Sequence, residues 1–188
     1  MIWKALGGIV LVVFIALAIG IATRPDTFRV ERKTHIAAPA TVVFAHINDF
    51  HEWAKWSPWE KIDTDLNKTY AGPPSGVGAI YSWSGKKTGD GTMTLKESTP
   101  NRTAIDLEFT KPMEAKNLAE FTSVPAGDGV DLTWTMSGAN TTMGKAFSLV
   151  MSMDKMIGND FEKGLADLKS VSEADAKAAP AGSLPAAK

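Results

Sequence analysis

The feature that most constrains the fold is a long amphipathic stretch near the end of the chain, residues 143–171. Its apolar side chains recur at intervals of three, four or their sums, which is the period of an α-helix. No proline interrupts it before Pro180. At 1.5 Å per residue such a helix is roughly 40 Å long and needs a broad apolar surface to pack on. The residues that form its stripe are Phe147, Val150, Met151, Ile157, Phe161, Leu165 and Leu168.

The preceding residues offer that surface as short segments in which apolar and polar side chains alternate. A first strand is expected over residues 26–36, and Pro39 then opens a short helix. From residue 67 onward, segments with period-two alternation follow one another between turns rich in Gly, Pro and Asp. The cleanest is residues 130–137, in which Leu132, Trp134 and Met136 share one face. This order predicts an α+β fold with an antiparallel sheet covered by helices on one face.

Composition excludes several classes of function. The chain has 188 residues, which suits one domain with appendages, and a net charge of −1, so no attraction to nucleic acid is expected. It contains no cysteine, which removes disulfides, thiolate metal sites and a cysteine nucleophile. The glycine-rich loop at residues 72–78 is not a phosphate-binding loop, because no Gly-Lys-Ser/Thr follows it. We expect no cofactor and no bound metal.

The N-terminus predicts a membrane anchor over residues 1–25. The 18 residues from Ala5 to Ala22 carry no charge and are mostly apolar, which reaches the lower limit for a spanning helix. Lys4 and Arg24 bracket the run. The alternative is a cleaved signal peptide, since residues 20–22 resemble a cleavage site. The prediction is a single-pass membrane protein. The basic residues after the span favour a domain in the cytoplasm, whereas the short start with Lys4 resembles an export signal, and of these two orientations the one with the domain outside the cytoplasm is preferred.

The domain that follows is expected to end where the helical pattern ends. Residues 26–171 carry the strands and the long helix. Residues 172–188 are rich in Ala and Pro without apolar periodicity, so they are predicted to form a disordered tail.

Residues 50–59 form the most distinctive short segment, because three of the six tryptophans fall within it: Trp53, Trp56 and Trp59. Pro58 prevents a continuous helix through the segment. Clustered aromatics on an irregular segment either roof a ligand pocket or pack as an aromatic corner without a ligand. Both interpretations stay open at the level of sequence.

Catalytic candidates are few. His51 lies beside Glu52 and the tryptophan cluster, so it is the best candidate for a general base, although a surface histidine is the commoner explanation. No His, Asp and Glu residues have metal-ligand spacing. Asp154 on the long helix is either a polar group inside a cavity or the partner of Lys145 or Lys155.

Six motifs of the chain are characteristic when taken together: IAAPATVVF at 36–44, WAKWSPW at 53–59, GPPSGVG at 72–78, LTWTM at 132–136, MDKMIG at 153–158 and FEKGL at 161–165. Through them the chain resembles the polyketide cyclase/dehydrase branch of the START and pollen-allergen superfamily, also called SRPBCC. This resemblance covers roughly residues 28–171. It implies the helix-grip fold, in which a curved antiparallel sheet of about six to seven strands wraps around a long C-terminal helix, with two short helices after the first strand.

The same resemblance implies a deep cavity between the sheet and the long helix. Trp56 and Trp59 would roof it, and Met151 and Phe161 would close its far side. The alternative is that these side chains fill the space themselves. The expected ligand-binding residues are Trp56, Trp59, Tyr81, Trp83, Met93, Phe109, Trp134, Met136, Met151 and Phe161.

Three functions compete at this stage. The first is a membrane-tethered module that binds an apolar small molecule or lipid, since aromatic and Met walls suit such a ligand. The alternative is an enzyme of the cyclase or dehydratase kind, acting on an aromatic or polyketide-type substrate. The third is a structural protein whose aromatic surface docks a partner.

Overall fold

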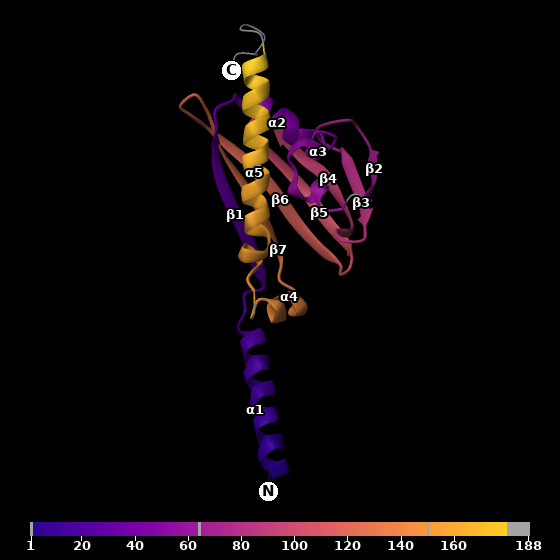
Figure 1. Ribbon diagram of the computed structural model, residues 1–188, viewed down its shortest axis with the longest axis vertical. Helices are drawn as coiled ribbons and strands as arrows, with labels where there is room; N and C mark the ends of the chain where they lie inside the picture. The colour runs from indigo at the N-terminus through magenta and orange to yellow at the C-terminus, as the bar shows by residue number, and fades with distance from the viewer. Residues whose placement is uncertain (1, 64, 150, 180–188) are drawn as a thin grey trace.

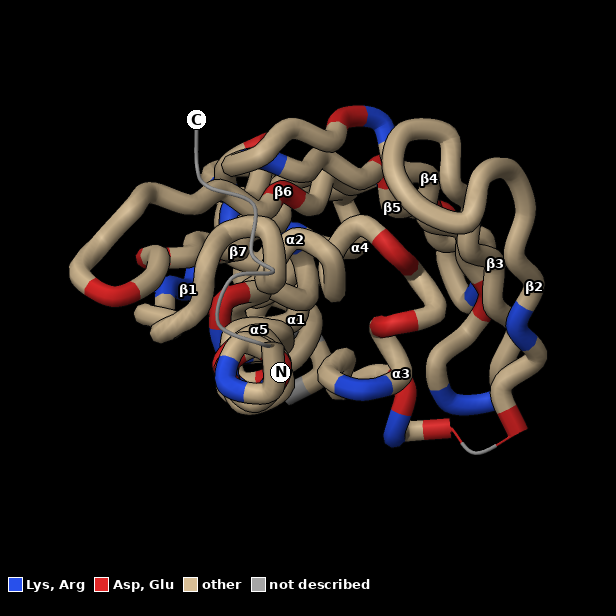
Figure 2. Tube along the Cα trace, turned by 90° about the horizontal axis from the view of Figure 1, so that it is seen from above, with Lys and Arg blue, Asp and Glu red and all other residues tan. Residues whose placement is uncertain are grey.

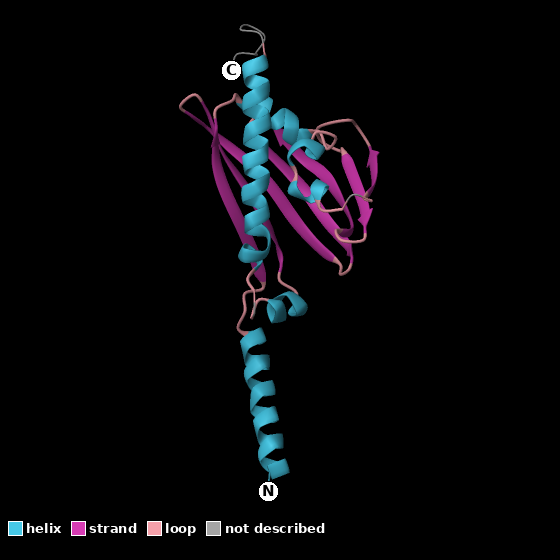
Figure 3. Cartoon of the chain, viewed as in Figure 1, coloured by secondary structure: helices cyan, strands magenta, loops and turns pink. Residues whose placement is uncertain are grey.

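Seven strands form one antiparallel sheet, and the long helix α5 lies across its concave face (Figures 1 and 3). The computed structural model describes residues 2–63, 65–149 and 151–179. The strand order is β1-β7-β6-β5-β4-β3-β2. The elements are α1 (Ile2–Ala22), β1 (Thr27–Ile36), α2 (Ala40–Asn48), α3 (Trp53–Trp56), η1 (Pro58–Lys61), β2 (Asn67–Ala71), β3 (Ile80–Gly85), β4 (Gly89–Thr99), β5 (Arg102–Lys111), β6 (Ala115–Ala126), β7 (Gly129–Ala139), α4 (Thr142–Phe147) and α5 (Met153–Ala178).

This architecture confirms the predicted helix-grip fold. Strands β2 to β7 are sequential neighbours, and the first strand closes the order by pairing with the last, with Val30 opposite Met136. Because side chains alternate across a strand, Val30, Leu132 and Trp134 point to one face, where they are buried. That face is the one covered by α2, α3 and α5.

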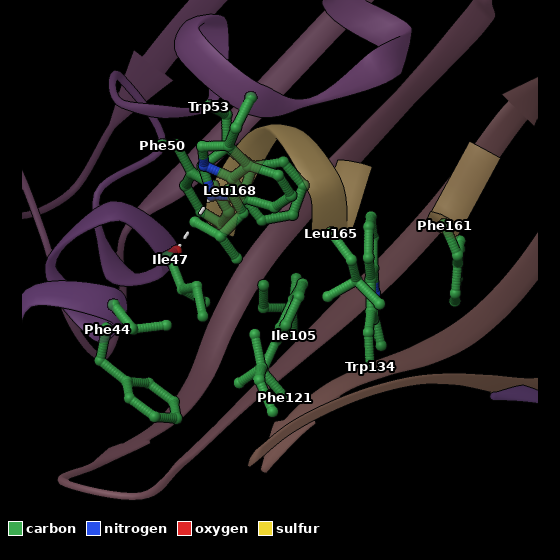
Figure 4. Close-up of a cluster of buried hydrophobic side chains, with 14 of the residues drawn as sticks. Phe44, Ile47, Phe50, Trp53, Ile105, Phe121, Trp134, Phe161, Leu165 and Leu168 are labelled. Carbon is green, nitrogen blue, oxygen red and sulfur yellow. Dashed lines mark hydrogen bonds between the residues drawn. The ribbon is translucent and has the colours of Figure 1, made fainter. Parts of the chain in front are cut away.

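The core lies between the sheet and the helices (Figure 4). Leu165 and Leu168 of α5 meet Ile105 and Phe121 of the sheet in one buried cluster. The indole N–H of Trp53 donates a hydrogen bond to the Ile47 carbonyl at 3.0 Å, which ties α3 to the end of α2. Helices α2, α3 and α5 therefore share one core with the sheet.

The long amphipathic helix differs from the prediction at both ends. Residues 143–171 do not form one helix: α4 ends at Phe147, and α5 begins at Met153, with the Ser152 hydroxyl accepting the Lys155 N–H. That hydroxyl is an N-cap, which satisfies a backbone donor at the helix start.

At its other end α5 runs through the first part of the predicted tail, to Ala178. Ser172 is fully buried, Glu173 accepts the Ala37 N–H at 2.9 Å, and Asp175 lies 3.1 Å from the Nε2 atom of His46. These tertiary contacts hold the helix where its own apolar pattern has ended. Residues 180–188 of the predicted tail lie outside the described residues.

Two glycines let α5 approach its neighbours closely. A Cβ atom at Gly164 would lie 2.9 Å from Cζ3 of Trp134 and 3.1 Å from Pro58. A Cβ atom at Gly158 would overlap the guanidinium of Arg32, which reaches from β1 to Asp154 and Glu162. Asp154 thus pairs with Arg32, and neither of its two predicted roles is correct. The Arg32 guanidinium is the end of a flexible side chain and can move, so it is Gly164, against the buried Trp134 ring, that lets the helix lie close to the sheet.

The N-terminal apolar stretch forms helix α1, which points away from the sheet (Figure 1). Most of its described apolar side chains are exposed, Phe14 among them. In the part of the chain that the structure describes, no helix combines the length and the apolar character needed to cross a membrane. This finding contradicts the predicted anchor and, with it, the predicted membrane localisation. The uncharged run of 18 residues only reaches the lower limit of length for a spanning helix, so it left no margin for the predicted anchor.

Charged residues of both signs are interspersed along strands, turns and α5 (Figure 2). Most are paired with an opposite charge, for example Lys61 with Asp167 at 2.7 Å. Such exposed pairs contribute little to stability individually.

Candidate functional site

A cavity of about 310 Å³ lies between the sheet and the helices that cover it. Strands β3 to β7 form its floor, and α3, η1 and the first turns of α5 form its roof. Its volume is at the lower end of the range of about 300–1,000 Å³ typical of small-molecule sites. The lining residues are Trp53, Ser57, Trp59, Glu60, Ile62, Leu66, Tyr81, Trp83, Lys87, Thr88, Met93, Leu107, Phe109, Ala119, Trp134, Met136, Ile157 and Phe161.

Most of the predicted ligand-binding residues come together around this cavity. Alternation along the strands explains this, since every second side chain of β3, β5 and β7 faces it. Phe161 reaches it from α5, one helical turn after Ile157. The predicted residues that line it are Trp59, Tyr81, Trp83, Met93, Phe109, Trp134, Met136 and Phe161.

Trp56 and Met151 do not line the cavity. The Trp56 ring is completely buried in the core, 5.6 Å from the Trp134 ring, and its indole N–H donates to the His46 carbonyl. Trp53 of the same helix lines the cavity in its place. Met151 lies in the break between α4 and α5 and is 46% exposed. The break that the sequence did not reveal moves Met151 away from the helix stripe.

Two tryptophans lie at the centre of the site and are fixed by ring contacts. The Trp134 ring stacks on Phe161 at 4.0 Å with an angle of 7° between the planes, and on Phe121 at 4.8 Å on its other side. The Trp83 ring lies over Gly91 of β4, where a Cβ atom would overlap it. Stacked and edge-on aromatic contacts add to burial, so this part of the cavity wall is rigid.

His51 lies away from the cavity. Its side chain is 53% exposed, its Nδ1 atom is 2.8 Å from Asp49, and its ring stacks on Tyr70 at 4.0 Å. Neither contact places its ring in the cavity between the sheet and α5, so His51 is not positioned to act on a ligand there. Among the described residues no group of His, Cys, Asp and Glu side chains could hold a metal ion.

Among the described residues that line the cavity, Glu60 is the one with an acidic side chain, and no sequence pattern pointed to it. Its side chain is only 7% exposed. The Tyr81 hydroxyl donates a hydrogen bond to Oε1 at 2.6 Å, and the Lys68 ammonium pairs with Oε2. Burial, and then the bond to Glu60, raise the pKa of the Tyr81 hydroxyl. Glu60 follows Pro58 in a 3₁₀ turn without periodicity, so only its place beside Trp59 could have pointed to it.

A buried carboxylate, Asp63, fixes the turn at the rim of the cavity through a backbone hydrogen bond. Asp63 is 6% exposed and accepts the backbone N–H of Lys87 at 2.8 Å, in the turn between β3 and β4. Backbone hydrogen bonds from this turn lower the pKa of Asp63. Thr88 next to Lys87 contributes a hydroxyl to the lining, and within the described residues its Oγ1 atom has no hydrogen-bond partner. The arrangement combines a mostly apolar container with a few polar groups, which fits binding of a small apolar molecule.

Comparison with known proteins agrees with this geometry. A family model described as "Polyketide cyclase / dehydrase and lipid transport" matches residues 27–173, which is most of the chain and the whole sheet. No curated protein matches the sequence.

Solved structures share the fold at low sequence identity. Protein CV1439 from Chromobacterium violaceum is 18% identical with a TM-score of 0.56, over 80% of this chain and 99% of that one. The di-domain ARO/CYC StfQ from the steffimycin biosynthetic pathway is 10% identical with a TM-score of 0.60, and the match spans 80% of this chain but 52% of that one. Ara h 8.0201 is 9% identical with a TM-score of 0.53, over 81% and 99%. These likenesses concern the fold alone.

Proposed function

This chain belongs to the polyketide cyclase/dehydrase and lipid transport family, and from that premise we propose that its cavity binds a small, mostly apolar molecule. The observation that carries the proposal is the cavity of about 310 Å³ with its aromatic and aliphatic lining. Eight of the ten ligand-binding side chains predicted from the sequence surround it. They are proposed to contact the ligand body, whereas Trp56 and Met151 are not.

Apolar burial alone is sufficient for useful affinity. Removing apolar surface from water contributes about 25 cal/mol per Å². A ligand that buries a few hundred Å² can therefore reach roughly micromolar dissociation constants without a charged contact. The stack of Phe121, Trp134 and Phe161 supports this. Because these rings are already fixed, little side-chain conformational freedom is lost when a ligand binds.

A second candidate is a reaction of the cyclase or dehydratase kind. The observation that favours it is the Glu60 carboxylate, which lies in the cavity and is hydrogen-bonded to Tyr81. A carboxylate in that position could take a proton from a polyketide-type chain. Turnover of a linear poly-β-ketone thioester by the wild type, and its loss in Glu60→Gln, would favour this candidate over binding alone.

The test of binding uses the protein's own tryptophans. Naphthalene is titrated into the protein while tryptophan emission is followed, because four tryptophans line the cavity: Trp53, Trp59, Trp83 and Trp134. We expect saturable quenching or a shift of the emission maximum.

A matched pair of variants locates the site. Ala119→Phe adds a ring inside the cavity, and Thr122→Phe adds the same ring on the exposed face of the same strand. We expect the first to weaken naphthalene binding at least tenfold and the second to leave it unchanged. Equal binding by the two variants would place the ligand elsewhere, and an absence of saturable change in the wild type would reject the binding function.

A further inference from the structure

We propose that the cavity selects ligands that carry an uncharged hydrogen-bond donor, such as a phenolic or alcoholic hydroxyl, and that Glu60 receives that donor. The inference rests on the proposed function, because it concerns the orientation of the ligand within the same cavity. It adds a ligand class and a specificity-determining residue to what the apolar lining provides.

The buried position of Glu60 is the first reason. A carboxylate that is 7% exposed inside an apolar site is costly unless it is paired and hydrogen-bonded. The structure supplies one donor for each oxygen: Tyr81 for Oε1 and Lys68 for Oε2. A carboxylate has about four acceptor sites, so acceptor capacity remains on the atoms that line the cavity. A ligand hydroxyl is the group that uses this capacity.

The local charge balance is the second reason. Lys68 neutralises Glu60, so the pair as a whole carries no net charge. A ligand ammonium would add an unbalanced positive charge, and a ligand carboxylate would face the Glu60 oxygens. The Tyr81 hydroxyl already donates to Glu60, so it does not offer its proton to the ligand. An uncharged donor can bond to Glu60 without leaving a buried charge unpaired.

The rest of the lining decides where the hydroxyl points. The side chains opposite η1 are apolar, Met93, Leu107 and Phe109 among them. We therefore expect a ligand with one hydroxyl to place its apolar body against β4 and β5 and its hydroxyl toward η1. A buried polar group distinguishes ligands more sharply than apolar contact does, because its absence leaves an acceptor unsatisfied.

The experiment compares ligands that share one skeleton. Naphthalene, 2-naphthol, 2-naphthoate and 2-naphthylmethylammonium are titrated against the wild type by tryptophan emission. We expect 2-naphthol to bind roughly tenfold more tightly than naphthalene, since a hydrogen bond to a charged group contributes about that much. We expect the two charged compounds to bind no more tightly than naphthalene.

Three variants then identify the responsible group. Glu60→Gln is expected to reduce the preference for 2-naphthol over naphthalene to about threefold or less. Glu97→Gln, which alters a carboxylate outside the lining, is expected to leave the preference unchanged. Lys68→Met leaves the Glu60 charge unbalanced, so binding of 2-naphthylmethylammonium should tighten about tenfold. Circular dichroism checks that each variant is folded, and if Glu60→Gln does not fold, the Lys68→Met result decides.

The outcomes separate this inference from the proposed function. If naphthalene does not bind the wild type, the binding function itself is rejected. If naphthalene binds but 2-naphthol shows no preference, or the preference persists in Glu60→Gln, the role of Glu60 is rejected and the apolar cavity stands. Tightest binding of 2-naphthoate would also reject it, because recognition would then depend on a lysine.

Discussion

Trp134 makes the most ring contacts of any side chain at the site, lying between Phe121 and Phe161 with the edges of Trp56 and Trp59 against it. Because it is 2% exposed, Trp134→Ala should lower the free energy of unfolding by about 3–5 kcal/mol. Trp134→Phe keeps one ring and should cost less. Denaturant unfolding measures both, and a loss below about 1 kcal/mol for Trp134→Ala would show that its contacts are not structural.

His35 makes a second residue-scale prediction, on the outer face of the sheet. Hydrogen bonds to Asp131 and Asp128, at 2.9 and 3.1 Å, raise the pKa of its imidazole. A raised folded-state pKa means that the stability contributed by these pairs is present below the unfolded value of about 6.5 and is lost as pH rises through the folded value.

Proton NMR titration of the His35 ring checks this. We expect a pKa above the unfolded value in the wild type and a lower one in Asp131→Asn. A wild-type pKa at or below the unfolded value would contradict the assignment of these contacts.

At the residue scale, the sequence predicted the cavity side chains that regular strands carry, such as Tyr81, Met93 and Met136. Period-two alternation is a local property, so it can be recognised without the fold. Glu60 and Trp56 could not be placed in the same way. Both belong to the irregular segment around Pro58, where the orientation of each side chain depends on contacts with α2, β2 and β3.

At the element scale, the position of α5 on the sheet depends on Gly164. Alanine favours a helix over glycine by about 1 kcal/mol, but its Cβ atom would lie 2.9 Å from Trp134. Overpacking of this kind costs about 1–3 kcal/mol. We therefore expect Gly164→Ala to lower the melting temperature, whereas Ser170→Ala, at an exposed position of the same helix, should leave it unchanged or raise it.

A higher melting temperature in Gly164→Ala would mean that α5 can move away from the sheet to accommodate the Cβ atom without loss of stability. The depth at which α5 sits on Trp134 would then not be set by this glycine. The comparison with Ser170→Ala removes the contribution of helix propensity from the result.

The sequence predicted the existence of α5 but not its ends, and the reason is physical. The apolar periodicity continues past the end of α4 at Phe147. It depends only on the spacing of apolar residues, so it does not reveal that Ser152 caps the start of a new helix. The C-terminal turns lack an apolar stripe and are held by Glu173 and Asp175, whose partners on α2 and before it are distant in sequence. Long-range polar contacts of this kind leave no local pattern.

At the scale of the whole molecule, α1 is separate from the core. All buried apolar residues lie after residue 28, and the described contact of α1 with the remainder of the chain involves α4 and Leu149. Removal of residues 1–23 is therefore expected to change the melting temperature of the remaining chain by only a few degrees.

Circular dichroism of the truncated and full-length proteins measures this, with the strand signal as the readout. Loss of that signal on truncation would show that α1 is needed for the sheet to fold. It would also contradict the predicted domain boundary at residue 26.

The central claim is that the space between the sheet and α5 is a ligand site rather than a packing defect. Calorimetric titration with 2-naphthol at several temperatures tests it most directly, because burial of apolar surface gives a negative heat-capacity change. The prediction is one site per chain with a negative heat-capacity change in the wild type and in Thr122→Phe, and binding at least tenfold weaker in Ala119→Phe. Absence of binding heat at every temperature in the wild type, or the same binding in Ala119→Phe, would contradict the claim.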